Sequence, residues 1–115
     1  MTREFIYMPE FDKQWRKCGL RDLQQREFEA YLCEYPEAGN IIQGTGGLRK
    51  FRWNLPGKGK SGGIRILYVD FPFYEKIHLI TCFPKSVKVS LSQEEKREVK
   101  IIIANIKLIL RGIEL

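Results

Sequence analysis

The chain has few cysteines and histidines, and their spacing excludes several kinds of site. Its 115 residues include three cysteines, Cys18, Cys33 and Cys82, and a single histidine, His78. An odd number of cysteines without a Cys-x-x-Cys pair is atypical of a disulfide framework or a zinc site. The carboxylates show no Asp-x-Asp spacing. We therefore expect free thiols in a reducing cytoplasm, no metal ion and no cofactor.

Long apolar runs are also missing. No stretch approaches the roughly 18 residues that a membrane-spanning helix needs. The first residues, Met1 to Phe5, lack the apolar segment of a signal peptide. The composition, with 43% apolar and 30% charged residues, is that of a globular protein. We expect a single domain over residues 1–115, located in the cytoplasm and without a membrane partner.

Acidic residues are absent from one long segment. Between Ala38 and Val69 there is no aspartate or glutamate, whereas the rest of the chain holds 14 basic and 14 acidic residues. The whole net charge of +6 therefore comes from this segment. A concentrated field of one sign attracts polyanions, so we expect a nucleic-acid partner. The basic residues of the segment are Arg49, Lys50, Arg52, Lys58, Lys60 and Arg65.

The apolar pattern predicts an α+β fold in the order β-α-α-β-β-β-α. Three strands joined by short loops should form an antiparallel meander, and strand 76–83, apolar on both faces, should be central. Ser92 with Glu95 is typical of a capping box and predicts the start of the last helix. The expected strands are 5–8, 48–55, 64–71 and 76–83, and the expected helices are 9–18, 20–35 and one from 92 onward.

Two helices carry apolar residues at helical spacing. The stripe of the second helix comprises Leu20, Leu23, Phe28, Tyr31, Leu32 and Tyr35, and that of the last helix comprises Val99, Ile102, Ile103, Ile106, Ile109 and Ile113. In the last helix, Ile101 and Leu108 lie outside this stripe, which suggests a second apolar face that could bind a partner chain. His78, in the middle of a strand, is interpreted as a structural rather than a catalytic histidine.

Alternation along strand 48–55 places Lys50 and Arg52 on one side, and Phe51 and Trp53 on the core side. If the sheet is curved, these two cations converge with Arg65, Lys58, Lys60, Lys85 and Lys88 on a concave surface. Such a surface binds phosphates and stabilises a pentavalent phosphate during RNA cleavage. A lysine crowded by other cations can serve as the base, because its pKa is depressed. Residues 44–47, Gly-Thr-Gly-Gly, lack the Gly-Lys-Ser/Thr ending of a P-loop, so nucleotide binding is not expected.

Residues 42–52, IQGTGGLRKFR, and 57–68, GKGKSGGIRILY, resemble the RelE/HigB superfamily of bacterial toxins, and its HigB-like branch in particular. The resemblance implies a fold similar to microbial ribonucleases, with a curved antiparallel sheet, two N-terminal helices and a C-terminal helix. It further implies a metal-independent endoribonuclease that cleaves mRNA in the ribosomal A site. A cognate antitoxin, a HigA-like helix-turn-helix protein, would be the partner, together with the ribosome and its mRNA.

By position, the resemblance implies four catalytic residues, Lys50, Arg52, Arg65 and Lys85. Lys58 and Lys60 match a basic loop that would grip ribosomal RNA, and we group Arg49 and Lys88 with them as RNA-binding residues. Family members often have a tyrosine or histidine near the position of Leu91, so the general base and acid are not identified. Two alternatives stay open, a DNA gyrase inhibitor of the same fold (ParE-like) and a non-catalytic RNA-binding module.

Overall fold

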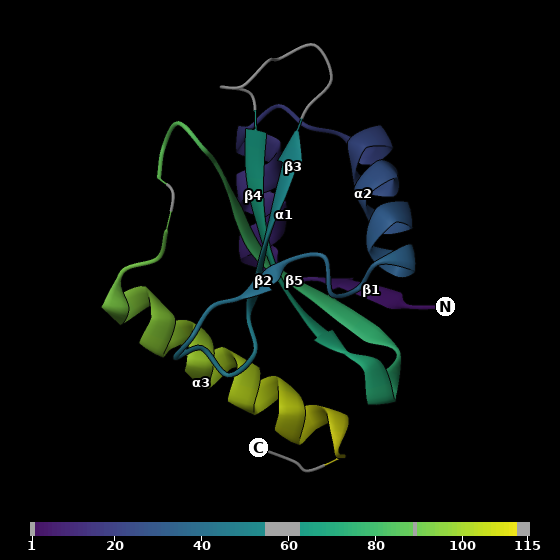
Figure 1. Ribbon diagram of the computed structural model, residues 1–115, viewed down its shortest axis with the longest axis vertical. Coiled ribbons are helices and arrows are strands. Elements are labelled where there is room, and N and C mark those ends of the chain that lie inside the picture. The colour runs from purple at the N-terminus through teal and green to yellow at the C-terminus, as the bar shows by residue number, and fades with distance from the viewer. Residues whose placement is uncertain (1, 55–62, 89, 113–115) are drawn as a thin grey trace.

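The computed structural model describes residues 2–54, 63–88 and 90–112, and it confirms the predicted α+β fold (Figure 1). A two-residue strand, β2, precedes the expected meander, in a segment that the sequence predicted to be only a connection. None of the helices in the described ranges has the length and apolarity needed to cross a membrane. The elements are β1 (Glu4–Tyr7), α1 (Pro9–Lys17), α2 (Asp22–Glu34), β2 (Asn40–Ile41), β3 (Arg49–Asn54), β4 (Gly63–Phe71), a short 3-10 helix (Pro72–Tyr74), β5 (Lys76–Pro84) and α3 (Gln93–Leu110).

The five strands form one curved sheet in the order β1-β5-β4-β3-β2. β2 to β5 pair antiparallel, so the predicted meander is confirmed, whereas β1 joins the edge of β5 in parallel. β4, rather than the expected strand 76–83, is the middle strand. β5 is nevertheless internal, because β1 covers its outer edge.

Each face of the sheet carries its own apolar core. Phe11 and Trp15 of α1, with Phe28 and Leu32 of α2, pack on one face. Three buried residues of α3, Val99, Ile103 and Ile106, pack on the other face. The predicted capping box starts α3, since Ser92 Oγ accepts from the Glu95 amide at 3.1 Å and the Ser92 amide donates to Glu95 Oε1 at 2.9 Å.

Both predicted helix stripes are wider than the buried faces. Leu23 and Tyr31 of α2 are exposed, and so is Tyr35 directly after it, because only a narrow row built on Phe28 and Leu32 reaches the sheet. In α3, Ile102 and Ile109 are exposed as well, and so is Ile101. Ile113 lies outside the described residues. The broad apolar surface of each helix is therefore only partly used by the core.

Strand β5 contains a β-bulge at Ile80. Leu67 of β4 pairs with Thr81, but the next residue, Tyr68, pairs with Leu79. The side-chain alternation of β5 changes phase across this point. Ile77, Leu79 and Cys82 lie in the core under α1, whereas Ile80 and Phe83 lie in the core under α3.

Tyr68 connects the segment after α2 to the middle of the sheet through two hydrogen bonds. Its buried hydroxyl donates to the Pro36 carbonyl at 2.8 Å and accepts from the Gly39 amide at 2.9 Å. A Cβ atom on Gly39 would lie only 3.0 Å from the Lys50 backbone and the Tyr68 ring, so this close approach requires glycine.

We expect Tyr68→Phe to lower the free energy of unfolding by about 1–3 kcal/mol, because it leaves a buried amide and a buried carbonyl without partners. Urea denaturation measures the effect. Tyr74→Phe is the matched control, since the described part of the chain shows no hydrogen bond for that hydroxyl. Equal stability of the two variants would contradict the role given to Tyr68.

His78 is buried in β5, as expected for a structural histidine. Its ring meets Phe71 edge-on with centroids 5.3 Å apart, and its Nδ1 atom has no hydrogen-bond partner among the described residues. Burial lowers the pKa of His78 from the usual 6.5, and the nearby Lys76 lowers it further. The imidazole is therefore neutral in the folded protein at pH 7.

The unfolded chain binds a proton at His78 more readily than the folded one, so we expect stability to fall as the pH drops below 6.5. His78→Phe should remove this part of the pH dependence. Urea denaturation at a series of pH values from neutral to acidic compares the two proteins. An imidazole NMR titration with a midpoint above 6.5 would contradict the prediction; His78 is the only histidine, which makes the signal unambiguous.

Candidate nucleic-acid interface

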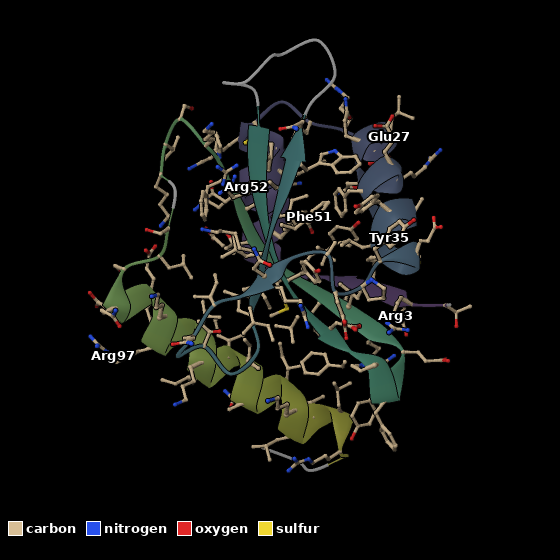
Figure 2. All side chains as sticks on the ribbon, viewed as in Figure 1. Arg3, Glu27, Tyr35, Phe51, Arg52 and Arg97 are labelled. Carbon is tan, nitrogen blue, oxygen red and sulfur yellow. The ribbon has the colours of Figure 1, made fainter. Side chains whose placement is uncertain are left out.

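Arg52 and Arg65 lie side by side on neighbouring strands. They are register partners in the antiparallel pair β3–β4, so their side chains leave the same face of the sheet. Figure 2 shows Arg52 on one side of β3 and Phe51 on the other, toward α2. The predicted alternation of this strand is thus confirmed, and it brings two guanidinium groups together on the face that α3 only partly covers.

Arg65 is a buried cation. Only 5% of its surface is exposed, and its Nε has no hydrogen-bond partner among the described residues. Burial lowers the pKa of Arg65, and the neighbouring Arg52 lowers it further, although a guanidinium stays charged at neutral pH. None of the ion pairs found in the described ranges involves Arg52 or Arg65.

Such a pair is costly for folding, because a buried charge without a counter-ion loses its hydration. Perturbed, uncompensated charges of this kind are concentrated at functional sites. Two adjacent guanidinium groups present the donors that a phosphate group accepts. The two guanidinium groups are therefore arranged in a way that suits the binding of an anion such as a phosphate.

Gly63 and Lys85 border this pair at one end. A Cβ atom on Gly63 would lie 3.8 Å from Arg65 Nη1 and 3.4 Å from the side-chain oxygen of Asn54. The Lys85 amide donates to the Gly63 carbonyl at 3.0 Å, which fixes the start of the exposed segment after β5 next to the Arg65 strand. The Lys85 backbone is thus held at the same end of the sheet as Arg65.

Lys50 borders the pair on the other side. It precedes Arg52 by two residues on β3 and shares its face of the strand. A groove of about 620 Å³ runs along β2 and β3 here, and both Lys50 and Arg52 line it, together with Asn40 and Ile42. Lys50, Arg52 and Arg65 therefore share one face of the β3–β4 pair, and the Lys85 backbone is held at the Gly63 end of that pair.

The residues predicted to bind RNA are placed less uniformly. Lys88 forms an ion pair with Glu95 and lies 5.3 Å above the ring of Phe83. Arg49 leaves the opposite side of β3 and donates to the carbonyls of Gly39 and Glu37, at 2.7 and 3.4 Å. The structure therefore does not bring Arg49 to the face of Arg52. Lys58 and Lys60 lie outside the described residues.

Two residues of this region escaped the sequence interpretation. Asn54 follows Lys50 and Arg52 on the same side of β3, and its position in that alternation was a signal that could have found it. Phe83 is the β5 register partner of Arg65, and its ring lies under the ammonium group of Lys88. Only the bulge in β5 turns Phe83 to this face, so the pattern of the sequence gave no sign of it. Leu91 is buried in the core under α3.

The chemistry available at this site is that of cations and amides. No group of three or more possible metal-ligating side chains occurs within residues 2–54, 63–88 and 90–112. Fixed guanidinium groups bind a phosphate and stabilise the negative charge that it gains when a nucleophile attacks. In the glycine-rich segment 44–47, Thr45 Oγ1 donates to the Ile42 carbonyl at 2.6 Å and accepts from the Leu48 amide at 3.1 Å, within its own turn.

Comparison with known proteins supports the fold. No family model matches the chain. Among solved structures, the chain is similar to a mutant of the Escherichia coli toxin RelE in the free state, with a TM-score of 0.58 and 18% sequence identity. The match covers 90% of this chain and 98% of the RelE chain. At this identity the likeness shows that the two chains share a fold, and the fold expected from the resemblance to the RelE/HigB superfamily is confirmed.

Proposed function

We propose that this protein is the toxin of a type II toxin–antitoxin system and cleaves mRNA on the ribosome. One observation carries the proposal: Arg65 is buried beside Arg52, and the described structure provides neither with a carboxylate. A phosphodiester supplies the missing negative charge. The RelE-like fold and the resemblance of residues 42–68 to the HigB-like branch support the same function.

The proposed reaction is an attack of the ribose 2′-hydroxyl on the adjacent phosphorus. The O2′–P bond forms, the bond to the 5′-oxygen of the next nucleotide breaks, and a 2′,3′-cyclic phosphate remains. Arg65 and Arg52 stabilise the pentavalent phosphate through charge-assisted hydrogen bonds. In this scheme Lys50 and Lys85, on either side of the pair, are the candidates for moving the two protons. No metal ion takes part.

The ribosome has a physical role in this scheme. Lysine is the only candidate base among the residues of the site that the structure describes. The cleavage rate therefore depends on holding the RNA in an in-line geometry. The ribosomal A site supplies that positioning. Lys58, Lys60 and Lys88 are proposed to contact ribosomal RNA, and a HigA-like helix-turn-helix antitoxin in the cytoplasm is the proposed inhibitor.

We expect Arg65→Ala to abolish growth inhibition and to lower the single-turnover cleavage rate by about 10²–10³-fold, the usual effect of losing one donor to a transition-state oxyanion. Arg97→Ala is the matched control, because Arg97 is exposed on α3 and lies apart from Arg52 (Figure 2). Circular dichroism checks the fold. Arg52→Ala, at an exposed position, provides a second test that burial does not complicate. Wild-type rates in both folded variants would refute the assignment.

We also expect cleavage to require the ribosome. Purified protein should cut an mRNA that is engaged by translating ribosomes and leave the same naked mRNA intact. The 5′ fragment should end in a 2′,3′-cyclic phosphate or its 3′-phosphate product. In cells, methionine incorporation should stop before thymidine incorporation; the reverse order would indicate a gyrase inhibitor, and efficient cutting of naked mRNA would contradict ribosome dependence.

A further inference from the structure

A second cavity lies on the opposite side of the sheet from Arg52 and Arg65. Its volume is about 640 Å³, within the range of roughly 300–1,000 Å³ that is typical of ligand pockets. Residues of the C-terminal end of α2 and of the segment after it form most of its wall, and Phe51 of β3 contributes to its lining. Figure 2 shows Arg3, Tyr35 and Phe51 on this side.

Aromatic rings form the apolar part of the cavity. Tyr31 stacks on Phe51 with centroids 5.4 Å apart and contacts Tyr35 at 5.0 Å. Tyr31 is 40% exposed and Tyr35 is 50% exposed. Their faces are available to a ligand, and the face of an aromatic ring attracts cations.

The charges of the cavity are negative, although the protein as a whole is positive. Glu34 and Glu37 both line the wall. Arg3 does not compensate them, because it is held by Asp70 through two bonds, at 2.8 and 3.3 Å, and both side chains are less than a tenth exposed. Arg49, the other nearby cation, points onto the backbone carbonyls of Glu37 and Gly39.

The wall of the cavity is preorganised. The Pro36–Gly39 segment is fixed by the buried Tyr68 hydroxyl, which bonds to both of its ends. Ala38, between them, lines the cavity. A ligand therefore does not have to order this segment, and less binding free energy is lost.

We propose that this cavity binds a basic side chain, an arginine in particular, carried by a flanking apolar segment of a partner protein. Exposed ring faces and two uncompensated carboxylates select a cation, and a planar guanidinium both stacks on tyrosine and bonds to carboxylate. The volume exceeds one side chain, so apolar neighbours of the arginine find room beside the rings. An RNA phosphate is excluded by the same carboxylates. The site goes beyond the proposed nuclease function and does not depend on it.

The test measures peptide binding by the full-length protein with ¹H–¹⁵N NMR. The probe is an acetylated and amidated pentapeptide, Ala-Leu-Arg-Leu-Ala, and its partner carries citrulline, the neutral isostere, in place of arginine. We expect saturable shifts of the amides of Tyr31, Glu34 and Glu37, and binding of the citrulline peptide that is weaker by about fivefold or more.

Variants identify the groups responsible. The double variant Glu34→Gln, Glu37→Gln should bind the arginine peptide only as tightly as the wild type binds the citrulline peptide. The control double variant, Glu94→Gln with Glu98→Gln at two exposed positions on α3, should keep the wild-type affinity. Tyr35→Leu keeps the apolar bulk but removes the ring face. It should lower the affinity for the arginine peptide more than the affinity for the citrulline peptide. Arg65→Ala should bind as the wild type does, which separates this site from the proposed nuclease.

Three results would overturn the proposal. The first is equal affinity for the arginine and citrulline peptides. The second is an absence of saturable shifts around the cavity. The third is binding of free spermidine that matches the peptide, with no loss when both leucines of the peptide become alanine, since the cavity would then be a polyamine site rather than a protein-docking site.

Discussion

The fold depends on the burial of β4 from both sides. Gly63 to Val69 are all buried, so this strand needs a covering layer on each face, with α1 and α2 on one and α3 on the other. The α3 layer ends near Phe83 and Leu91. Beyond it, at the Gly63 end of β4, Arg65 occupies a position that an apolar residue would otherwise fill. The candidate site thus arises where one covering layer stops and the strand remains buried.

The single strand β3 then separates two opposite electrostatic environments. Lys50 and Arg52 lie on the face that carries Arg65, whereas Phe51, between them, lines the acidic, aromatic cavity. The sheet backbone lies between the two proposed sites, so an anion bound at one and a cation bound at the other would not compete for space. This arrangement explains how a protein with a strong positive charge retains a local surface that is negative.

The sequence predicted what local patterns control. The order of the elements, the capping box at Ser92 and the alternation of residues 48–55 are properties of short stretches, and all are confirmed. The parallel pairing of β1, the two-residue β2 and the exposed side of α2 depend on contacts between distant segments, which a single sequence does not display. The same limit holds for the sites: alternation predicted the basic face and placed Arg49 on the opposite side of the strand, but the burial of Arg65 and the hydrogen bonds of Arg49 to backbone carbonyls required the three-dimensional packing.

The bulge at Ile80 determines which face of the sheet the second half of β5 contributes to. Without the extra residue, strict alternation from His78 onward would turn Phe83 toward α1 and place Cys82 under α3. The extra residue reverses which face of the sheet the following residues of β5 point to. The first half of β5 can therefore pack Ile77 and Leu79 under α1, while the second half places Phe83 beside Arg65 and leads into Lys85. A deletion of one residue here would leave the composition of the strand almost unchanged and yet turn Phe83 to the opposite face of the sheet. Length at this point of the chain is therefore under a stricter constraint than side-chain identity.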